Sequence, residues 1–541
     1  MLTKLNRPGA RLAPWLGAIC AGLVLASASS ASLAQLSAAA EAPEPVFAIV
    51  GFELSGDLPV PVEEAQQILA PFVSPKATIA SLQRATSTLE AALVAQGFAL
   101  HRVQLPPQEV GSKVKLQIVK YVIGKITLEG NKLYGNDNIR DSVLELQEDQ
   151  APNFSLLAIQ TAIANENPGK QIKVSLKESA DANKIDAVVQ VRESNPLVFS
   201  VSLSNSGSAA TGQDRLSLVF SDSNVFDLDH QFSAAYTTSI ESKGNVQQLG
   251  LNYRVPIYEV GGMLGFSFTT SDVVGKFGNY SSTGAGQTYG VSYSHYLEPV
   301  GGQRSYLTLA MDEKRFDAAK LNGQANLGSL PRSSRPITLG YSARIESDKA
   351  VWGYNAEVAA NWSGGSANNL QAYQSEDPRN SNVNWKALRG GANYVTSFAK
   401  GWLWSARGQF QYSPDALISG EQFGLGGSGS VRGTGERPIS GDSGWFASVE
   451  VTTPNLQPGL QALAFVDAGG LSNQQLVLSP NKPASDQLVS AGLGLRYNTA
   501  RYGITADYGR VLTGSVLPRA PASDIPQTGD EKIHINLNAR F

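Results

Sequence analysis

Arg432 is the residue whose sequence surroundings most restrict the chemistry it can perform. It stands in the glycine-rich segment 424–435, which has too few apolar side chains to form a core of its own. A guanidinium held away from bulk water needs a fixed carboxylate partner, because an unpaired buried charge is costly. Asp467, further along in the strand-like segment 460–468, offers that carboxylate. These residues predict an ion pair that docks a loop, and they do not suggest catalysis.

Alternation along the neighbouring strand-like segments indicates which side chains share a face. Phe465 and Asp467 lie on the opposite face from the apolar set of segment 460–468, and Ser448 and Glu450 point the same way in the preceding strand. Glu450 is therefore a second candidate partner for Arg432. A bidentate arginine–carboxylate pair would fix the position of the loop. The alternative is a solvated surface loop, in which Arg432 has no fixed partner.

Other chemistry receives little support from the residues. The pattern Gly424-x-Gly426-x-x-Gly429 matches a dinucleotide fingerprint, but it does not follow a strand and open a helix. The four histidines show no metal-ligand spacing; they are His101, His230, His295 and His534. A net charge of −3 without a basic stripe argues against nucleic acid as a partner. We expect no enzyme, cofactor, metal or small-molecule substrate.

The elements that must position Arg432 fill residues 196–541, where apolar and polar residues alternate as in strands. Sixteen such segments begin near residues 197, 215, 230, 246, 262, 287, 304, 336, 352, 384, 402, 444, 460, 487, 502 and 532. Every second connection is short and the others are mostly longer, up to the loop 413–443. This pattern is typical of a transmembrane β-barrel of antiparallel strands. We expect the loop 413–443 to fold back inside that barrel, and His295 and His534 to lie in its wall.

The N-terminal segment 1–34 reads as a signal peptide. Three basic residues precede an apolar stretch, and small residues at 32–34 suit cleavage. The single cysteine, Cys20, falls in this segment, so the mature chain is expected to have no disulfide. Residues 35–45 read as a short linker. No later apolar run is long enough for a spanning helix, so we expect any membrane passage to be made by a closed barrel.

Between the linker and the barrel, one order of elements occurs twice. Each unit, 46–121 and 122–195, reads as strand, helix, helix, strand, strand. The first unit is expected to have strands at 47–54, 98–104 and 113–121 and helices at 62–70 and 78–96. The second is expected to have strands at 122–129, 171–176 and 185–191 and helices at 136–146 and 153–166. These are small α+β domains.

This order resembles the POTRA domains that precede certain outer-membrane barrels in the periplasm. The motifs around the loop are more specific: 423–427 reads FGLGG, 429–433 reads GSVRG and 465–469 reads FVDAG. They are similar to signatures of the two-partner secretion transporters, which export haemolysins and filamentous adhesins. The resemblance implies that Arg432 pairs with Asp467 inside the barrel. The loop-docking residues implied are Val431, Arg432, Gly433, Phe465, Asp467 and Gly469, with Glu450 added by the strand pattern.

Two features depart from the family. Thr434 replaces the aromatic residue that usually follows the VRG motif, which puts a packing role for that position in doubt. Better-known members also have an N-terminal plug helix in the pore, and segment 35–45 is too short for one, so we predict none. The last strand ends in Phe541, which resembles the signal that the barrel assembly machinery reads.

The function implied is that of an outer-membrane transporter in a Gram-negative bacterium. Its POTRA domains would capture an unfolded exoprotein with an N-terminal secretion domain in the periplasm. The barrel, surrounded by outer-membrane lipids, would then secrete that protein to the cell surface. One alternative is an assembly factor of the same superfamily that inserts other barrels, although such relatives commonly carry more POTRA domains. A passive porin is a further alternative, but it would leave the periplasmic domains without a purpose.

Overall fold

The computed structural model describes twelve stretches of the chain. They are residues 45–109, 111–208, 211–241, 246–272, 275–277, 280–282, 285–318, 320–321, 324–325, 329–474, 482–519 and 523–541. The predicted signal peptide, nearly all of the linker 35–45, and with it the prediction that no plug helix occurs there, lie outside these residues. Within the described stretches, no helix is both long enough and apolar enough to cross a membrane.

The first domain is a three-stranded sheet packed against two helices. Its elements are β1 (Gly51–Gly56), α1 (Val62–Leu69), the short 3-10 turn η1 (Ala70–Phe72), α2 (Ile79–Ala95), β2 (His101–Gln104) and β3 (Lys113–Lys120). β3 lies in the middle, parallel to β1 and antiparallel to β2. Thr78 caps α2 by accepting a hydrogen bond from the backbone of Ser81. The predicted first strand began too early, because Phe47 makes only an isolated bridge to Ala77.

The second domain repeats that arrangement. Its elements are β4 (Val122–Glu129), α3 (Asn136–Asp141), α4 (Phe154–Ala164), β5 (Lys170–Glu178) and β6 (Lys184–Glu193). β6 is central, with β4 parallel on one side and β5 antiparallel on the other. The first helix is shorter than the predicted span 136–146, because the chain turns after Asp141. The same order in both domains places β2 and β5 at sheet edges.

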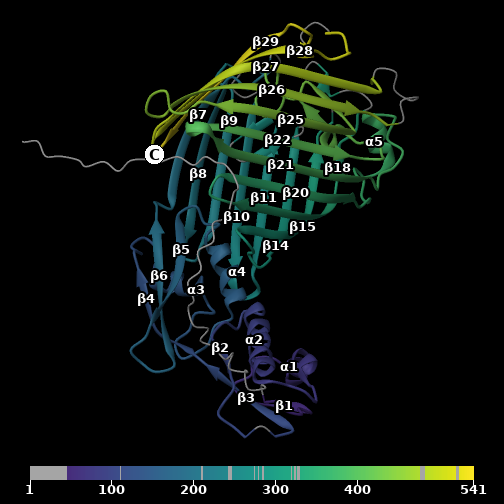
Figure 1. Ribbon diagram of the computed structural model, residues 1–541. Coiled ribbons are helices and arrows are strands. Elements are labelled where there is room, and N and C mark those ends of the chain that lie inside the picture. The colour runs from purple at the N-terminus through teal and green to yellow at the C-terminus, as the bar shows by residue number, and fades with distance from the viewer. Residues whose placement is uncertain are drawn as a thin grey trace, which may run out of the picture.

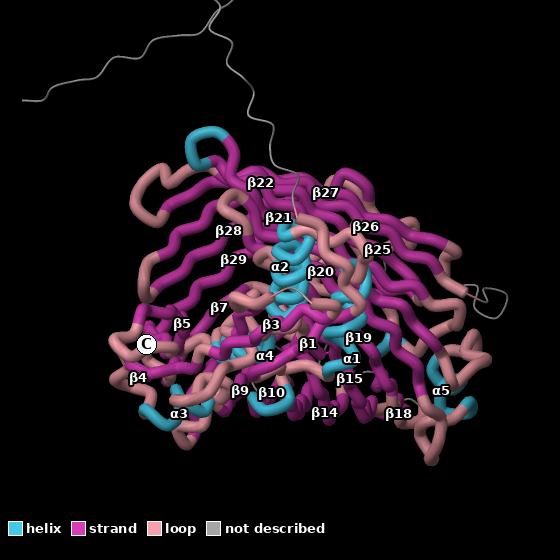
Figure 2. The backbone as a smooth tube through the Cα atoms, turned by 60° about the horizontal axis from the view of Figure 1, so that its bottom comes forward, coloured by secondary structure: helices cyan, strands magenta, loops and turns pink. Residues whose placement is uncertain are grey.

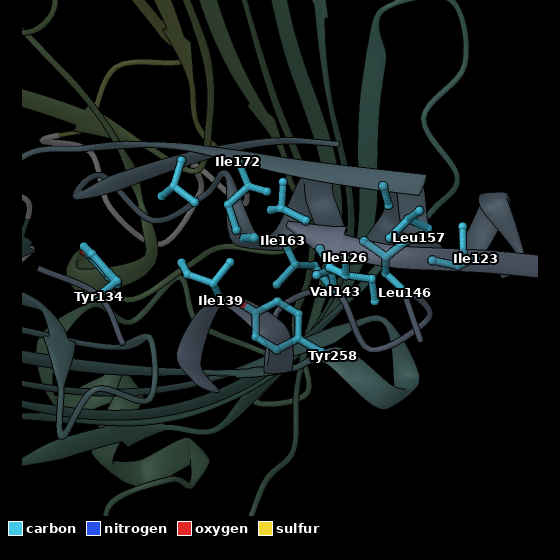
Figure 3. Close-up of a cluster of buried hydrophobic side chains, with 14 of the residues drawn as sticks. Ile123, Ile126, Tyr134, Ile139, Val143, Leu146, Leu157, Ile163, Ile172 and Tyr258 are labelled. Carbon is cyan, nitrogen blue, oxygen red and sulfur yellow. The ribbon is translucent and has the colours of Figure 1, made fainter. Parts of the chain in front are cut away.

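The second domain shares its core with the barrel. Tyr258, from the connection η2 (Tyr258–Val260), lies among apolar side chains of the second domain such as Ile139 and Leu157 (Figure 3). The hydroxyl of Tyr258 donates a hydrogen bond of 2.7 Å to Asp229, which lies in the connection between β8 and β9. The same carboxylate forms a buried ion pair with Lys170 at the start of β5. The second domain is thus joined to the barrel by both apolar and charged contacts.

Residues 197–540 form one closed barrel of antiparallel strands (Figure 1). The spanning strands are β7 (Leu197–Ser204), β8 (Arg215–Val225), β9 (His230–Thr238), β10 (Gln247–Ile257), β11 (Gly262–Ser271), β14 (Gly286–Tyr296), β15 (Gln303–Phe316), β19 (Pro336–Glu346), β20 (Ala350–Asn361), β21 (Lys386–Phe398), β22 (Trp402–Tyr412), β25 (Ser443–Thr452), β26 (Leu460–Ser472), β27 (Ser485–Asn498), β28 (Tyr502–Thr513) and β29 (Glu531–Arg540). These sixteen strands confirm the predicted barrel, and the short β18 (Arg332–Ser334) extends the wall beside β15.

Shorter elements lie in the connections between the spanning strands. They are β12 (Gly275–Phe277), β13 (Tyr280–Ser282), β16 (Lys320–Leu321), β17 (Gln324–Ala325), α5 (Leu370–Glu376), η3 (Ala399–Gly401), η4 (Ser419–Glu421), β23 (Phe423–Leu425) and β24 (Ile439–Gly441). The helix α5 lies at the opposite end of the strands from the C-terminus (Figure 1). Viewed from the side of the N-terminal domains, α2 and α4 lie in front of the barrel strands (Figure 2).

Alternation of side chains along each strand explains why this sequence closes into a barrel. On β26, Val466 is 53 % exposed on the outer surface, whereas Asp467 is 0 % exposed. Successive side chains of a strand point to opposite faces, so the apolar set faces outward and the polar set faces the lumen. Closure is made by β29 with β7 through five residue pairs, Asn536–Arg540 against Ser200–Ser204. These pairs join the last strand to the first and close the barrel.

Candidate functional site

Loop 6, defined here as residues 413–442 between β22 and β25, folds back into the barrel. Its two limbs pair as a short hairpin, β23 with β24. Leu425 and Val431 of the loop are fully buried with Phe446, Leu471 and other apolar residues that point inward from the wall. These contacts explain why a loop so rich in glycine has a fixed path: its few apolar side chains pack with inward-facing residues of the barrel wall in one buried cluster.

The guanidinium of Arg432 lies at the tip of loop 6 and is only 1 % exposed. Its Nε donates to Oδ2 of Asp467 at 2.8 Å, and its Nη2 donates to Oδ1 of the same carboxylate at 2.8 Å. The backbone N–H of Arg432 also donates to Oδ2, at 3.1 Å. This is a bidentate pair, the geometry that fixes both the distance and the orientation of an arginine.

The remaining donors of Arg432 reach the neighbouring strand. Nη1 lies 2.7 Å from Oε1 of Glu450, and Nη2 donates to the hydroxyl of Ser448 at 3.2 Å. Asp507 on β28 is more distant, with its carboxylate 3.9 Å from Nη1. The guanidinium carbon lies 3.4 Å from the centre of the Phe465 ring, so the cation stacks on that aromatic face. We name Arg432, Asp467, Glu450, Ser448 and Phe465 the inner cluster.

Two glycines allow the loop to approach the wall closely. Gly433 has φ of +86°, a conformation that favours glycine, and a Cβ there would lie 2.7 Å from the carbonyl oxygen of Gly509. Gly469 leaves space for Leu425, because a Cβ at Gly469 would lie 2.6 Å from a methyl carbon of that leucine. Both glycines of the predicted loop-docking set therefore lie where loop 6 contacts the barrel wall.

The structure brings the predicted residues together around loop 6, from Val431 and Gly433 in the loop to Glu450, Phe465, Asp467 and Gly469 in the wall. Phe541 lies elsewhere, beside the closing strands, where its backbone N–H donates to the carbonyl of Phe199 at 2.8 Å. We propose roles in docking and transport for the residues around loop 6, and a role in assembly for Phe541.

Two contacts at the loop tip were not foreseen from the sequence. Thr434, which stands where an aromatic residue is usual, accepts a hydrogen bond from the backbone of Gly427 at 2.9 Å and donates one to the carbonyl of Val431 at 2.8 Å. His534, expected only as a wall residue, accepts a hydrogen bond of 3.0 Å from the backbone N–H of Gly433 through Nε2. The alternation of β29 places His534 inward, and that was the available signal.

A cavity of about 660 Å³ adjoins the inner cluster within the barrel. Polar and charged side chains line much of it, among them Arg407, Arg496 and Asp507. In the described parts of the chain, no group of three or more histidine, cysteine, aspartate or glutamate side chains is placed to hold a metal ion. The arrangement at Arg432 can hold a loop in one position beside a polar lumen.

Comparison with known proteins identifies the family to which this architecture belongs. Residues 183–497 match the family described as haemolysin secretion/activation protein ShlB/FhaC/HecB, and residues 47–120 match the ShlB-type POTRA domain. The outer membrane transporter CdiB of Dickeya dadantii (strain 3937) is 25 % identical over 402 residues, covering 71 % of this chain and 68 % of that protein. CdiB of Escherichia coli O6:K15:H31 (strain 536 / UPEC) is 23 % identical over 429 residues, covering 75 % and 69 %.

Solved structures show the same fold. The structure of CdiB from Escherichia coli covers 93 % of this chain and 92 % of its own, with a TM-score of 0.71 and 19 % identity. That of CdiB from Acinetobacter baumannii covers 92 % and 90 %, with a TM-score of 0.69 and 16 % identity. The barrel lies in the outer membrane and the POTRA domains lie in the periplasm. The chain belongs to the haemolysin secretion/activation protein ShlB/FhaC/HecB family, whose members are outer-membrane transporters of two-partner secretion.

Proposed function

We propose that this transporter captures an unfolded exoprotein through its POTRA domains and passes that protein through the barrel to the cell surface. The observation that carries the proposal is loop 6, held inside a polar lumen by the inner cluster. The exoprotein would carry an N-terminal secretion domain that the POTRA domains recognise. No step of this export is assigned to catalysis, since the inner cluster has a positioning geometry and no nucleophile–base pair.

The second POTRA domain offers a place for the arriving chain. Within the described residues, β5 pairs with β6 alone. At its other edge the side chain of Asn165 binds the backbone N–H and carbonyl of Ile172, and beyond that residue the edge is free of a strand partner. A cavity of about 1380 Å³ lies between α4, β5 and the barrel connection between β14 and β15, which carries Pro299 and Gly302. An extended polypeptide can add to such an edge through backbone hydrogen bonds, which need no particular sequence. A client bound at this edge would lie beside the barrel.

Assembly of the transporter would depend on its last strand. The side chain of Phe541 is 69 % exposed, and its ring centre lies 6.2 Å from that of Phe199 on β7. We propose that the barrel assembly machinery reads β29 and Phe541 before the barrel closes. The outward apolar side chains then contact outer-membrane lipids.

The first experiment places a photo-reactive amino acid at Leu176, which lies on β5 and is 41 % exposed. Irradiation of intact cells should join it to one large exported protein, through that protein's N-terminal region. The same substitution at Leu133, which is 54 % exposed in the same domain but away from β5, is the control and should give little of this adduct. Adducts with a mixture of barrel precursors would instead support the assembly-factor alternative.

A further inference from the structure

Arg379 is a fully buried arginine that lies outside the inner cluster. It lies in loop 5, defined here as residues 362–385 between β20 and β21, and is 0 % exposed. Loop 5 lies at the outer end of the barrel and contains α5 (Figure 1). The charge of Arg379 must be compensated, because burying an unpaired guanidinium is strongly unfavourable.

The carboxylate across from Arg379 belongs to Asp442, the last residue of loop 6. Nη1 of Arg379 lies 2.7 Å from Oδ2 of Asp442, and both side chains are 0 % exposed. A second carboxylate, that of Asp377, comes from loop 5 itself and accepts from Nη2 at 2.7 Å. Burial opposes the charge of Arg379, but the two carboxylates outweigh that effect and raise its pKa above the usual value. We name Arg379, Asp442 and Asp377 the outer cluster.

Asp442 also organises the backbone around it. Its Oδ1 accepts from the backbone N–H of Leu417, at 3.0 Å, on the opposite limb of loop 6. Its Oδ2 accepts from the backbone N–H of Gln474, at 2.8 Å, just after β26. Arg379 in turn donates to the carbonyl of Gln474 at 2.9 Å. One buried ion pair thus joins loop 5, both limbs of loop 6 and the chain that leaves β26.

Apolar packing beside the outer cluster joins the same segments. Tyr373 of α5 and Trp385 at the end of loop 5 are fully buried with Leu417 and Ile418 of loop 6. Phe316, at the outer end of β15, belongs to the same group. Loop 5 and the start of loop 6 therefore share a small core at the outer end of the barrel, and the ion pair lies at its side.

We propose that Arg379 and Asp442 are positioning residues that hold the base of loop 6 against loop 5, so that loop 6 is fixed at two separate points. The inner cluster holds its tip and the outer cluster holds its base. A buried ion pair adds little to stability compared with apolar residues, but loss of one partner leaves a buried charge unpaired. Such a pair therefore specifies one arrangement of the loops. The inference rests on the proposed function, because the arrangement matters when the lumen opens.

The test compares two carboxylates that pair with the same arginine. Asp442→Asn weakens the contact between loops, whereas Asp377→Asn weakens only the contact within loop 5. Full-length protein is purified and its single-channel openings are counted in a planar lipid bilayer. Asp442→Asn should raise the frequency of large openings by at least about tenfold, because the buried carboxylate that ties loop 6 to Arg379 loses its charge. Asp377→Asn should stay within about threefold of the native protein, because the Asp442 contact still holds the two loops together.

A second measurement follows the loops directly. The only cysteine in the sequence is Cys20, which lies in the predicted signal peptide, so introduced cysteines can be spin-labelled selectively. Labels at Gln371 in α5 and at Pro414 in loop 6 lie on exposed positions. Their distance distribution should be narrow in the native protein and in Asp377→Asn, and broad in Asp442→Asn. Arg379→Met should behave like Asp442→Asn.

Unchanged openings and an unchanged distance in Asp442→Asn, with the barrel still folded as judged by its heat-dependent migration on gels, would overturn the proposal. Neither measurement involves an exoprotein. A failure here would therefore leave the capture experiment at Leu176 as a separate test of the proposed function.

Discussion

The guanidinium of Arg432 contacts two carboxylates, one on each of two neighbouring strands, and these carboxylates differ in their exposure to solvent. The Asp467 side chain is 0 % exposed and makes the bidentate contact, whereas the Glu450 side chain is 20 % exposed and contacts one nitrogen. A charge that water still reaches is partly screened, so its loss matters less. Asp467 should therefore carry most of the restraint on the tip of loop 6.

Asp467→Asn should release the loop tip far more than Glu450→Gln. Weakening a fully buried pair is expected to remove up to about 3–5 kcal/mol of restraint, and the partly exposed pair about 1 kcal/mol or less. Proteolysis of loop 6 in intact cells measures the difference, because a released loop becomes accessible. Equal protection of the loop in the two variants would contradict the unequal roles assigned to these carboxylates.

At the residue scale, the sequence predicted Arg432, Asp467 and Glu450 because strand alternation places both carboxylates on the inward face. It did not predict the pairing of Arg379 with Asp442. Both lie next to or within irregular loops, where no periodicity shows which way a side chain points. Their contact is made between loops far apart in sequence, and only the folded barrel brings those loops together.

The junction between the second domain and the barrel is built around the connection between β8 and β9. The connection between β8 and β9 has three residues other than glycine at positive φ, Phe226 at 60°, Asp227 at 58° and Asp229 at 59°. Such backbone persists only when its surroundings hold it. The second domain supplies those surroundings, since Gly135 donates to the carboxylate of Asp227 at 3.2 Å and Lys170 pairs with Asp229.

Lys170→Met should loosen this junction without unfolding the barrel. The substitution leaves the buried carboxylate of Asp229 without its cation, at an expected loss of about 3–5 kcal/mol. Limited proteolysis of the purified protein should then cut between β6 and β7 faster than in the native protein. Lys184→Met is the matched control, because Lys184 pairs with Asp149 on the exposed surface of the same domain. Equal cleavage of both variants would argue against a junction held by Lys170.

At the element scale, helices and strands were predicted correctly where their side chains follow a regular period. The predictions failed at element ends, where that period does not show where the element stops. Alternation located the barrel strands, and the helical period located α2. Leu82, Leu89 and Leu93 share the buried face of α2, whereas Ile79 at the first turn of the helix is 47 % exposed. The segment 142–146 was expected to continue the first helix of the second domain, but the chain leaves that helix in a turn. Its Val143 and Leu146 are buried in the same core as Ile139 of α3 and Leu157 of α4.

At the scale of the whole molecule, loop 6 connects the parts of the transporter. Its tip contacts β25 and β26 through Arg432 and β29 through the hydrogen bond from Gly433 to His534. Its base is tied to loop 5 through Asp442. The barrel was predictable from alternation and from the lengths of its connections, and the family from its motifs. The path of loop 6 could be seen only in the structure, because a glycine-rich segment has no periodic pattern of apolar side chains from which its course could be predicted.

Whether the ion pair of Arg432 is needed for export is measured by secretion of the native exoprotein by Arg432→Ala, at equal amounts of folded transporter in the outer membrane. Secretion should fall to a small fraction of the native level, because the tip of loop 6 loses its buried ion pair. Arg496→Ala is the control. Arg496 also lines the lumenal cavity but pairs with Asp507 on the neighbouring strand, at 2.7 Å, and should export normally. Undiminished secretion by Arg432→Ala would show that export does not need loop 6 to be held by this ion pair.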